Sequence, residues 1–432
     1  MRKRHVFTAV AAAVIVGCAG SAANAAGAFT LQSSSFADGK MLPKKMANSK
    51  ANAPNNPNCV GDNVSPQLSW SNVPDGAKSL VLLMIDPEGR GGAGVNHWVA
   101  YGIPTSVTGF AEVETSKLTE SFVGGKSTQG VGFYSGPCTP PGTTPHHYTF
   151  VLIGTDFDVK ELPPGLTKDE VTDKIAPNGG APVHAKGSAG LSACSSIRGT
   201  NDLKTIAART SRPSVRAATA PLRGAMQPRK GDFMRSKRVC LFTAAAAALT
   251  LGFAASAADA AGIFTLQSQT FADGKIMPKK VANVNASGNA PNCVGENVSP
   301  ELSWSNVPDG TKSFVLLMSD PEGRAPSGVS HWVAYGIPAN VTGFAEGETS
   351  KPSEKYVGGK STMGVGNYSG PCTPPGVSPH HYTFILVATD FEPTELPPGL
   401  TREEVIAKFG PPPAHIKGST GLVGLFLNPW HE

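Results

Sequence analysis

The chain contains the same sequence twice. Ser65–Arg90 and Ser299–Arg324 agree at 22 of 26 positions, at a constant offset of 234 residues. A solenoid stacks three or more repeats of about 20–45 residues, whereas each unit here has about 170 residues and is long enough to bury its own core. The repeat therefore predicts two similar lobes, each self-sufficient, in one chain of 432 residues.

Each copy begins with a segment typical of an export signal. Residues 1–25 combine a basic start, an apolar run and small residues at Ala23-Asn24-Ala25, the three-part pattern of a secretory signal peptide. Residues 234–260 repeat this pattern, starting with Met234-Arg235-Ser236-Lys237-Arg238. We therefore expect a periplasmic or secreted protein in which both segments act as signals.

Two other interpretations of these segments stay open. Cys18 closes Ile15-Val16-Gly17-Cys18, which is similar to a lipoprotein cleavage box and allows a lipid anchor. The alanine-rich run of the second segment is also long enough to span a membrane, but its basic flank would then oppose the positive-inside tendency. Membrane contact is expected only through these segments or through such an anchor.

The two copies stop matching after Leu191, and a basic segment with little apolar periodicity follows. We interpret it as read-through or out-of-frame sequence that joins two tandem genes, and we expect lobe 1 to lack its final strand. The expected order is a signal peptide over 1–25, lobe 1 over 26–191, the junction over 192–233, a second signal-like segment over 234–260 and lobe 2 over 261–432.

The net charge of +5 does not indicate a nucleic-acid-binding protein. Residues 195–238 alone carry eleven Lys and Arg against two Asp, a local +9, which leaves −4 for the rest of the chain. Nucleic-acid binding needs a basic patch or stripe on the folded domain. We therefore expect neither lobe to bind DNA or RNA.

Short apolar segments between clusters of Pro, Gly, Asn and Asp predict a β-sandwich in each lobe. Residues 79–85 are apolar at both odd and even positions, as in a strand that is covered on both faces. Thr167 and Glu170 have the spacing of a capping box and predict a helix, with a twin that starts at Thr401. The expected strands of lobe 1 span residues 28–36, 67–70, 79–86, 96–103 and 147–155.

Three short motifs carry side chains that suit an anion pocket. Asp86 ends an apolar strand, His97 lies in the next strand, and His146 and Tyr148 share one face of a third. Imidazole and phenol groups can donate hydrogen bonds to a phosphate-like group, and the Asp86 carboxylate could orient a histidine. Taken singly, Asp86-Pro87 is equally typical of a turn, and His97 of a buried core histidine.

Together with the glycine loop Gly136-Pro137-Cys138, these motifs resemble bacterial phosphatidylethanolamine-binding proteins, also called Raf-kinase-inhibitor-like proteins. Asp86-Pro87-Glu88, His97-Trp98-Val99 and His146-His147-Tyr148 carry the resemblance, which covers roughly residues 28–191 and 263–427. It implies a mainly β fold and a pocket that binds a small anion or phospholipid headgroup without catalysis or cofactor. The implied ligand-binding residues are Asp86, His97, Gly136, His146 and Tyr148, with Asp320, His331, Gly370, His380 and Tyr382 in lobe 2.

The sequence departs from the family pattern at Glu88 and Glu322, where aspartate is usual, and at the inserted Thr139 and Thr373. Inhibition of a kinase or protease by protein contact is the alternative function that the family implies. A hydrolase is a further alternative, but no serine or cysteine stands out as an activated nucleophile. A metal site in the pocket is chemically possible, but no Cys/His spacing motif supports it, so no metal is expected.

The seven cysteines predict one disulfide in each lobe. Cys18 and Cys240 fall in the signal-like segments and Cys194 in the diverged tail. The four that remain favour Cys59–Cys138 and Cys293–Cys372, given export to an oxidising compartment. Free buried thiols are the alternative.

Overall fold

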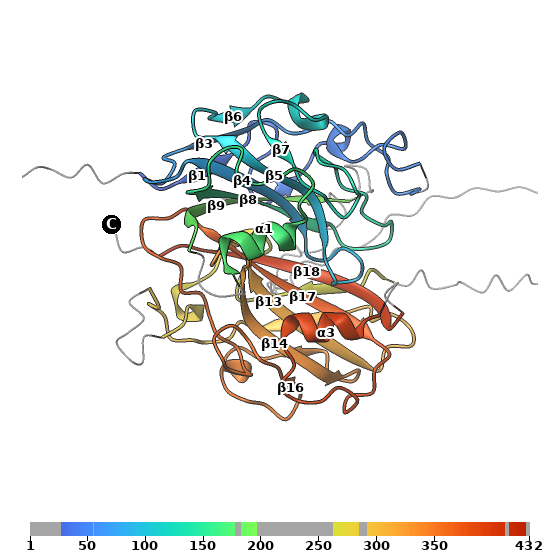
Figure 1. The fold of residues 1–432 in the computed structure, drawn as a ribbon. Helices are drawn as coiled ribbons and strands as arrows, with labels where there is room; N and C mark the ends of the chain where they lie inside the picture. The colour runs from blue at the N-terminus through green and yellow to red at the C-terminus, as the bar shows by residue number, and fades with distance from the viewer. Residues whose placement is uncertain are drawn as a thin grey trace, which may run out of the picture.

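The computed structural model describes residues 27–54, 56–177, 183–196, 262–284, 292–410 and 414–428. Within them the chain forms two lobes that pack face to face, lobe 1 in blue to green and lobe 2 in yellow to red (Figure 1). Both segments with a signal-like sequence, and the junction after residue 196, lie outside the described residues. None of the described helices is long and apolar enough to cross a membrane.

Each lobe consists of a six-stranded sheet packed against a three-stranded sheet, with the same strand order in both copies. The mainly β, duplicated sandwich predicted from the sequence is therefore confirmed. In lobe 1 the larger sheet is ordered β2 (Lys40–Met41), β9 (Ala185–Ser195), β8 (His146–Thr155), β4 (Ser79–Asp86), β5 (Val95–Pro104) and β7 (Val123–Gly124), and the smaller β1 (Thr30–Gln32), β3 (Leu68–Ser71) and β6 (Gly109–Phe110). In lobe 2 the larger sheet is ordered β11 (Lys275–Ile276), β18 (Ile416–Phe426), β17 (His380–Thr389), β13 (Ser313–Asp320), β14 (Val329–Pro338) and β16 (Val357–Gly358), and the smaller β10 (Thr265–Gln267), β12 (Leu302–Ser305) and β15 (Gly343–Phe344).

Strand β4 is central, as its apolar pattern predicts. It lies between β8 and β5, and its alternate residues enter two different cores. Leu80 and Leu82 pack between the two sheets, whereas Val81 and Leu83 pack on the opposite face with residues of α1. Both faces of the strand are buried, so it carries apolar side chains on both.

The helices begin where the sequence predicts. Helix α1 spans Lys168–Ile175 and α3 spans Arg402–Lys408. The Thr167 hydroxyl accepts a bond from the Glu170 backbone N–H while the Glu170 carboxylate accepts one from the Thr167 N–H, and Thr401 repeats this arrangement. The other helices in the described ranges are 3₁₀ turns at η1 (Lys44–Met46), η2 (Glu114–Ser116), η4 (Lys279–Val281) and η5 (Glu348–Ser350).

Four of the five expected strands of lobe 1 are found to within one residue at either end, and the first is shorter than predicted. Only Thr30–Gln32 of residues 28–36 pairs as a strand. Beyond it, the Ser33 hydroxyl donates to the Gln67 carbonyl, and the Gln67 side chain accepts from the Ser34 N–H. These serine and glutamine side chains take the place of the backbone ladder.

The prediction that lobe 1 lacks its last strand is wrong. Strand β9 runs four residues beyond the expected boundary and pairs with β8 up to Ser195. Ala193 packs in the core between the sheets, while β2 pairs in parallel with Ala193 and Cys194. The hydrogen bonds of the ladder come from the backbone, and small side chains fit the inner face of the sheet. The strand therefore forms although its sequence differs from that of the second copy after Leu191.

This strand gives a test of the corrected boundary. Ala193→Asp should lower the free energy of unfolding by about 3 kcal/mol or more, because it places an unpaired charge in the core. Lys186→Ala at the exposed start of β9 removes only a partly exposed ion pair with Asp156, for which about 0–1 kcal/mol is expected. Chemical denaturation measures both, and equal effects would contradict the observed path of the strand.

Candidate ligand-binding site

The four predicted pocket side chains of lobe 1 converge at one end of the six-stranded sheet. Asp86 is the last residue of β4, His97 lies near the start of β5, and His146 and Tyr148 lie at the start of β8. Because β4 pairs antiparallel with both β5 and β8, the end of β4 lies beside the starts of its neighbours. The strand order thus places residues that are 60 positions apart in direct contact.

The Asp86 carboxylate orients His146. Its Oδ2 lies 2.9 Å from Nδ1 of His146, and both side chains are buried. Burial alone would lower the pKa of His146, but the charge of Asp86 and this hydrogen bond outweigh it and raise the pKa. Burial alone would raise the pKa of Asp86, but the charge on His146 outweighs burial, so the pKa of Asp86 is lowered. The pair therefore favours an imidazolium beside a carboxylate.

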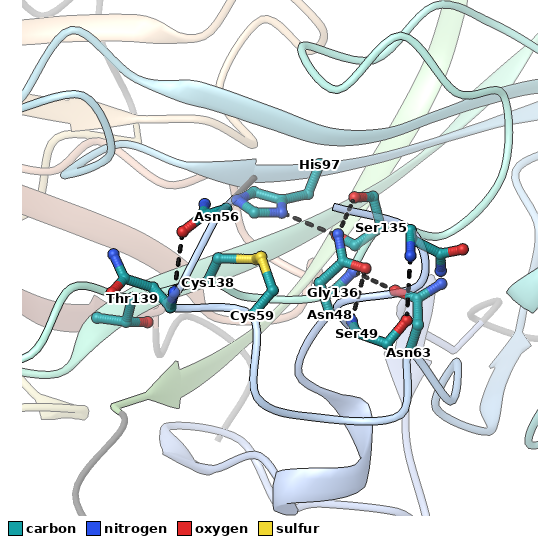
Figure 2. Close-up of a disulfide and its surroundings, with 12 residues drawn as sticks. Asn48, Ser49, Asn56, Cys59, Asn63, His97, Ser135, Gly136, Cys138 and Thr139 are labelled. Atoms are coloured by element: carbon teal, nitrogen blue, oxygen red, sulfur yellow. Dashed lines mark hydrogen bonds between the residues drawn. A yellow bond between two sulfur atoms is a disulfide. The ribbon is translucent and has the colours of Figure 1, made fainter. Parts of the chain in front are cut away.

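His97 has the opposite electrostatic character. Burial lowers its pKa more than the nearby Asp86 raises it, which favours the neutral ring. Its Nδ1 lies 2.8 Å from the Ser135 carbonyl oxygen, so Nδ1 carries the proton and Nε2 is an acceptor. Figure 2 shows the ring directed at the loop that carries Ser135.

Tyr148 completes the cluster from the same strand as His146. Its ring packs edge-on against His97 with 5.1 Å between ring centroids, and its hydroxyl lies 2.9 Å from Oγ1 of Thr139. Burial raises the pKa of the phenol well above its usual value, so it stays a neutral hydrogen-bonding group. The inserted Thr139 thus has a defined role as the partner of Tyr148.

These side chains line a cavity of about 510 Å³. Nε2 of His146 is buried and has no hydrogen-bond partner among the described residues, so it is available to a ligand. Arg90, which the sequence analysis missed, also borders the cavity, as do residues of lobe 2. The lobe 2 residues at this border are Ile416, Lys417, Gly418 and Ser419.

Lobe 2 repeats the arrangement at the expected positions. His380 Nδ1 lies 2.8 Å from the Asp320 carboxylate, and His331 Nδ1 lies 2.8 Å from the Ser369 carbonyl. The Tyr382 hydroxyl lies 2.8 Å from the Thr373 hydroxyl. The pKa of His380 is raised and that of His331 is lowered, from the same balance of burial and charge as in lobe 1.

The family resemblance implies that Gly136 and Gly370 bind the ligand, but their backbone N–H groups are already bonded within each lobe. The N–H of Gly136 donates to the Asn63 side chain at 2.8 Å, so it is not free to meet a ligand. A Cβ at Gly136 would lie 2.0 Å from the Met46 carbonyl oxygen, which explains why the position is glycine. Gly370 repeats both features with Asn297 and Val281.

Both expected disulfides are present, Cys59–Cys138 and Cys293–Cys372. In lobe 1 the bridge lies beside His97 and ties the segment around Asn56 to the loop that carries Ser135 and Thr139 (Figure 2). The bridge and the Asn48 bond to the Ser135 hydroxyl at 3.0 Å hold the loop against the pocket histidine. Of the cysteines that the structure describes, Cys194 is the one outside a disulfide, and it is buried.

The histidine next to the pocket joins the two lobes. His147 alternates to the other face of β8, where its Nδ1 lies 2.6 Å from the Glu88 carboxylate and its Nε2 lies 3.0 Å from Asp273 of lobe 2. His381 makes the reciprocal contacts with Glu322 and with Asp38 of lobe 1. These reciprocal contacts relate the lobes by an approximate twofold axis.

Glycines allow the sheets to approach closely at this interface. A Cβ at Gly190 would clash with the Glu322 carboxylate, and one at Gly421 with that of Glu88. Gly39 and Gly274 meet backbone to backbone near the axis. The interface roles of Glu88, Glu322 and these glycines are not visible in the sequence, because the residues that they contact lie in the opposite lobe.

The interface histidines make stability depend on pH. Burial lowers the pKa of His381, but Glu322 and Asp38 outweigh it and raise the pKa from 6.5 to about 10. A histidine whose pKa is higher in the folded than in the unfolded protein stabilises the fold fully at pH values below its unfolded-state pKa. This contribution is lost as the pH rises through its folded-state pKa. The free energy of unfolding should therefore fall between pH 6.5 and about 10, as measured by denaturation over that range.

A matched pair of variants assigns this effect to the interface. His381→Ala leaves the Glu322 carboxylate buried and unpaired, which should cost about 3–5 kcal/mol, and should reduce the pH dependence. His415→Ala removes a half-exposed pair with Asp390, worth about 0–1 kcal/mol. An unchanged pH dependence in His381→Ala would contradict the assignment.

Known proteins are similar to this chain in both of its lobes. The model of the family described as "Phosphatidylethanolamine-binding protein" matches residues 32–188 and 267–412. A UPF0098 protein of Aquifex aeolicus is 34% identical over 166 residues, which is 38% of this chain and 88% of that protein. LppC of Mycobacterium tuberculosis, whose name describes a lipoprotein, is 36% identical over 154 residues, 36% of this chain and 68% of LppC.

One solved structure was also found to be similar to this chain. The crystal structure of Escherichia coli YbcL, described as a member of the mammalian PEBP family, is 28% identical and covers 38% of this chain and 97% of that chain, with a TM-score of 0.33. The family model matches one region in each lobe and well over half of the chain in total. The chain therefore belongs to the phosphatidylethanolamine-binding protein family and carries two tandem copies of its domain.

Proposed function

We propose that this chain is an exported binding protein without catalytic activity, which holds a phosphate-type anion or a phospholipid headgroup in the Asp/His/His/Tyr pocket of each lobe. One observation carries the proposal. Within the part of the chain that the structure describes, the buried Nε2 of His146 has no hydrogen-bond partner, and His146 borders a cavity that His97 and Tyr148 also line. An imidazolium held by Asp86 offers a charged donor at that atom.

The two histidines favour a group that both accepts and donates a hydrogen bond. His146 donates from Nε2 when it is charged, whereas neutral His97 accepts at its own Nε2 because Nδ1 faces the Ser135 carbonyl. A singly protonated phosphate, or a phosphate ester with one hydroxyl, supplies both an oxygen acceptor and an O–H donor. The nearby Arg90 adds positive charge at the border of the cavity.

The bonds within the pocket favour binding over hydrolysis. A hydrolytic site needs a nucleophile held against a base. The Thr139 hydroxyl, which lines the cavity, is bonded to the Tyr148 hydroxyl and lies 3.1 Å from the Ser195 carbonyl oxygen. It therefore holds the tyrosine in place and is not directed at the base His146.

Export is supported by two kinds of observation. Each lobe contains a disulfide, and such bonds persist mainly in oxidising compartments. A relative bears a name that describes a lipoprotein, which agrees with the signal-like sequence at residues 1–25. Periplasmic or secreted localisation is therefore part of the proposal.

Inhibition of a kinase or protease is the alternative function, and it would use the same fold through an outer surface.

Loss of one pocket histidine should weaken binding at one of the two sites. His146→Ala in the full chain should cost about 1.5–3 kcal/mol at the lobe 1 site, the range for a hydrogen bond to a charged group. Asp86→Asn should also weaken that site, because the histidine loses the carboxylate that raises its pKa. Calorimetric titration with phosphate and phosphoethanolamine measures the affinity and the number of sites.

His380→Ala is the matched change in lobe 2, and the double variant should bind at neither site. His184→Ala serves as a control, since His184 lies away from the pocket and pairs with Asp156. The assignment fails if the parent chain binds neither ligand at millimolar concentration, or if the double variant binds as the parent does.

Binding should weaken as pH rises, but at higher pH than an ordinary histidine would give. The pKa of His146 is raised above its usual 6.5, so the charged donor persists past that value and is lost as pH rises further. Titrations across this range should show Asp86→Asn shifting the loss of affinity to lower pH. An affinity that does not change with pH would exclude His146 as the charged donor.

A further inference from the structure

A second group of metal-binding residue types lies where the lobes meet. One ligand atom from each of His147, Cys194 and Asp273 lies within 4.8 Å of the other two. His147 and Cys194 are directly opposite each other in the β8–β9 ladder, so their side chains share a face of the sheet. Asp273 reaches the same point from lobe 2. The pocket function does not use Cys194.

Each of the three side chains is held in place before any ion is considered. The Glu88 carboxylate fixes Nδ1 of His147 at 2.6 Å and leaves Nε2 directed at Asp273. A carboxylate behind a histidine in this way is the usual support of a metal-bound imidazole. Asp273 accepts a bond from the Val423 N–H at 2.9 Å, and Cys194 is buried within β9.

We propose that His147, Cys194 and Asp273 form a site for a divalent transition metal of the zinc class, shared between the two lobes. Imidazole nitrogen, thiolate sulfur and carboxylate oxygen are the three donor types that zinc accepts, and a fourth position remains for water. The thiolate selects soft or borderline ions over Mg²⁺ and Ca²⁺. No metal is expected from the sequence, because these ligands are far apart in the chain.

Lobe 2 provides a natural control. His381, Glu322 and Asp38 repeat the histidine and both carboxylates, but Leu425 occupies the position of Cys194, opposite His381 in the ladder. The cluster on that side of the axis therefore has no thiol at the matching position. It serves as the thiol-free counterpart of the site proposed here.

Cobalt(II) titration of the full chain tests the proposal, because a cobalt–thiolate bond gives a characteristic near-ultraviolet absorption band. With Cys18 and Cys240 replaced by serine in every sample, Cys194 is the remaining cysteine outside the two disulfides. The parent should bind about one equivalent with the thiolate band, and zinc should displace the cobalt. Cys194→Leu should lose the band, and Leu425→Cys should bind about two equivalents.

A second pair of variants tests the role of the supporting carboxylate. Glu88→Gln should weaken cobalt binding roughly 10- to 100-fold, whereas Glu322→Gln makes the matched change in the twin and should leave it unchanged. Circular dichroism and thermal unfolding report whether the two variants fold alike. Cobalt binding without the thiolate band, or an equal band in Cys194→Leu, would overturn the proposal.

Discussion

The structure depends on two carboxylates that hold two neighbouring histidines. Asp86 and Glu88 flank one proline after strand β4, and His146 and His147 are consecutive at the start of β8. Side chains alternate along a strand, so the two histidines point to opposite faces of the sheet. Asp86 binds His146 on the pocket side, and Glu88 binds His147 on the side that faces lobe 2. The same short segments therefore build a ligand site and an interface.

This arrangement connects the pocket to the contact between the lobes. Ser419 of lobe 2 donates to the Glu88 carbonyl, and residues 416–419 border the lobe 1 cavity. A shift of lobe 2 would thus move both the edge of the cavity and the segment that carries Asp86. The partner lobe therefore forms part of the border of the lobe 1 pocket.

The pocket residues could be assigned from the sequence through the family resemblance, and strand alternation indicates which of their side chains share a face. His97, His146 and Tyr148 were placed on their faces by a period of two, and β4 was recognised as central because both of its faces are apolar. The interface could not be predicted in this way. In the sequence, Glu88 stands out only as a departure from the family motif, and His147 has no assigned role. Asp273, which contacts His147, lies in the other lobe.

The end of lobe 1 shows a different limit of sequence comparison. Divergence from the second copy after Leu191 suggested a lost strand, yet the backbone ladder continues through Ser195 because it does not require particular side chains. The glycine loop was also misread. Gly136 is glycine because another backbone packs against it, and such a close approach is visible only in three dimensions.

Imidazole nitrogen NMR of the full chain, recorded with and without phosphate, tests the central claim most directly. The account predicts a charged ring at His146, a neutral ring protonated on Nδ1 at His97, and phosphate-induced shifts at these two residues. His147 should be charged and should respond little to phosphate. A neutral His146, or phosphate shifts confined to residues outside the pocket, would contradict the account.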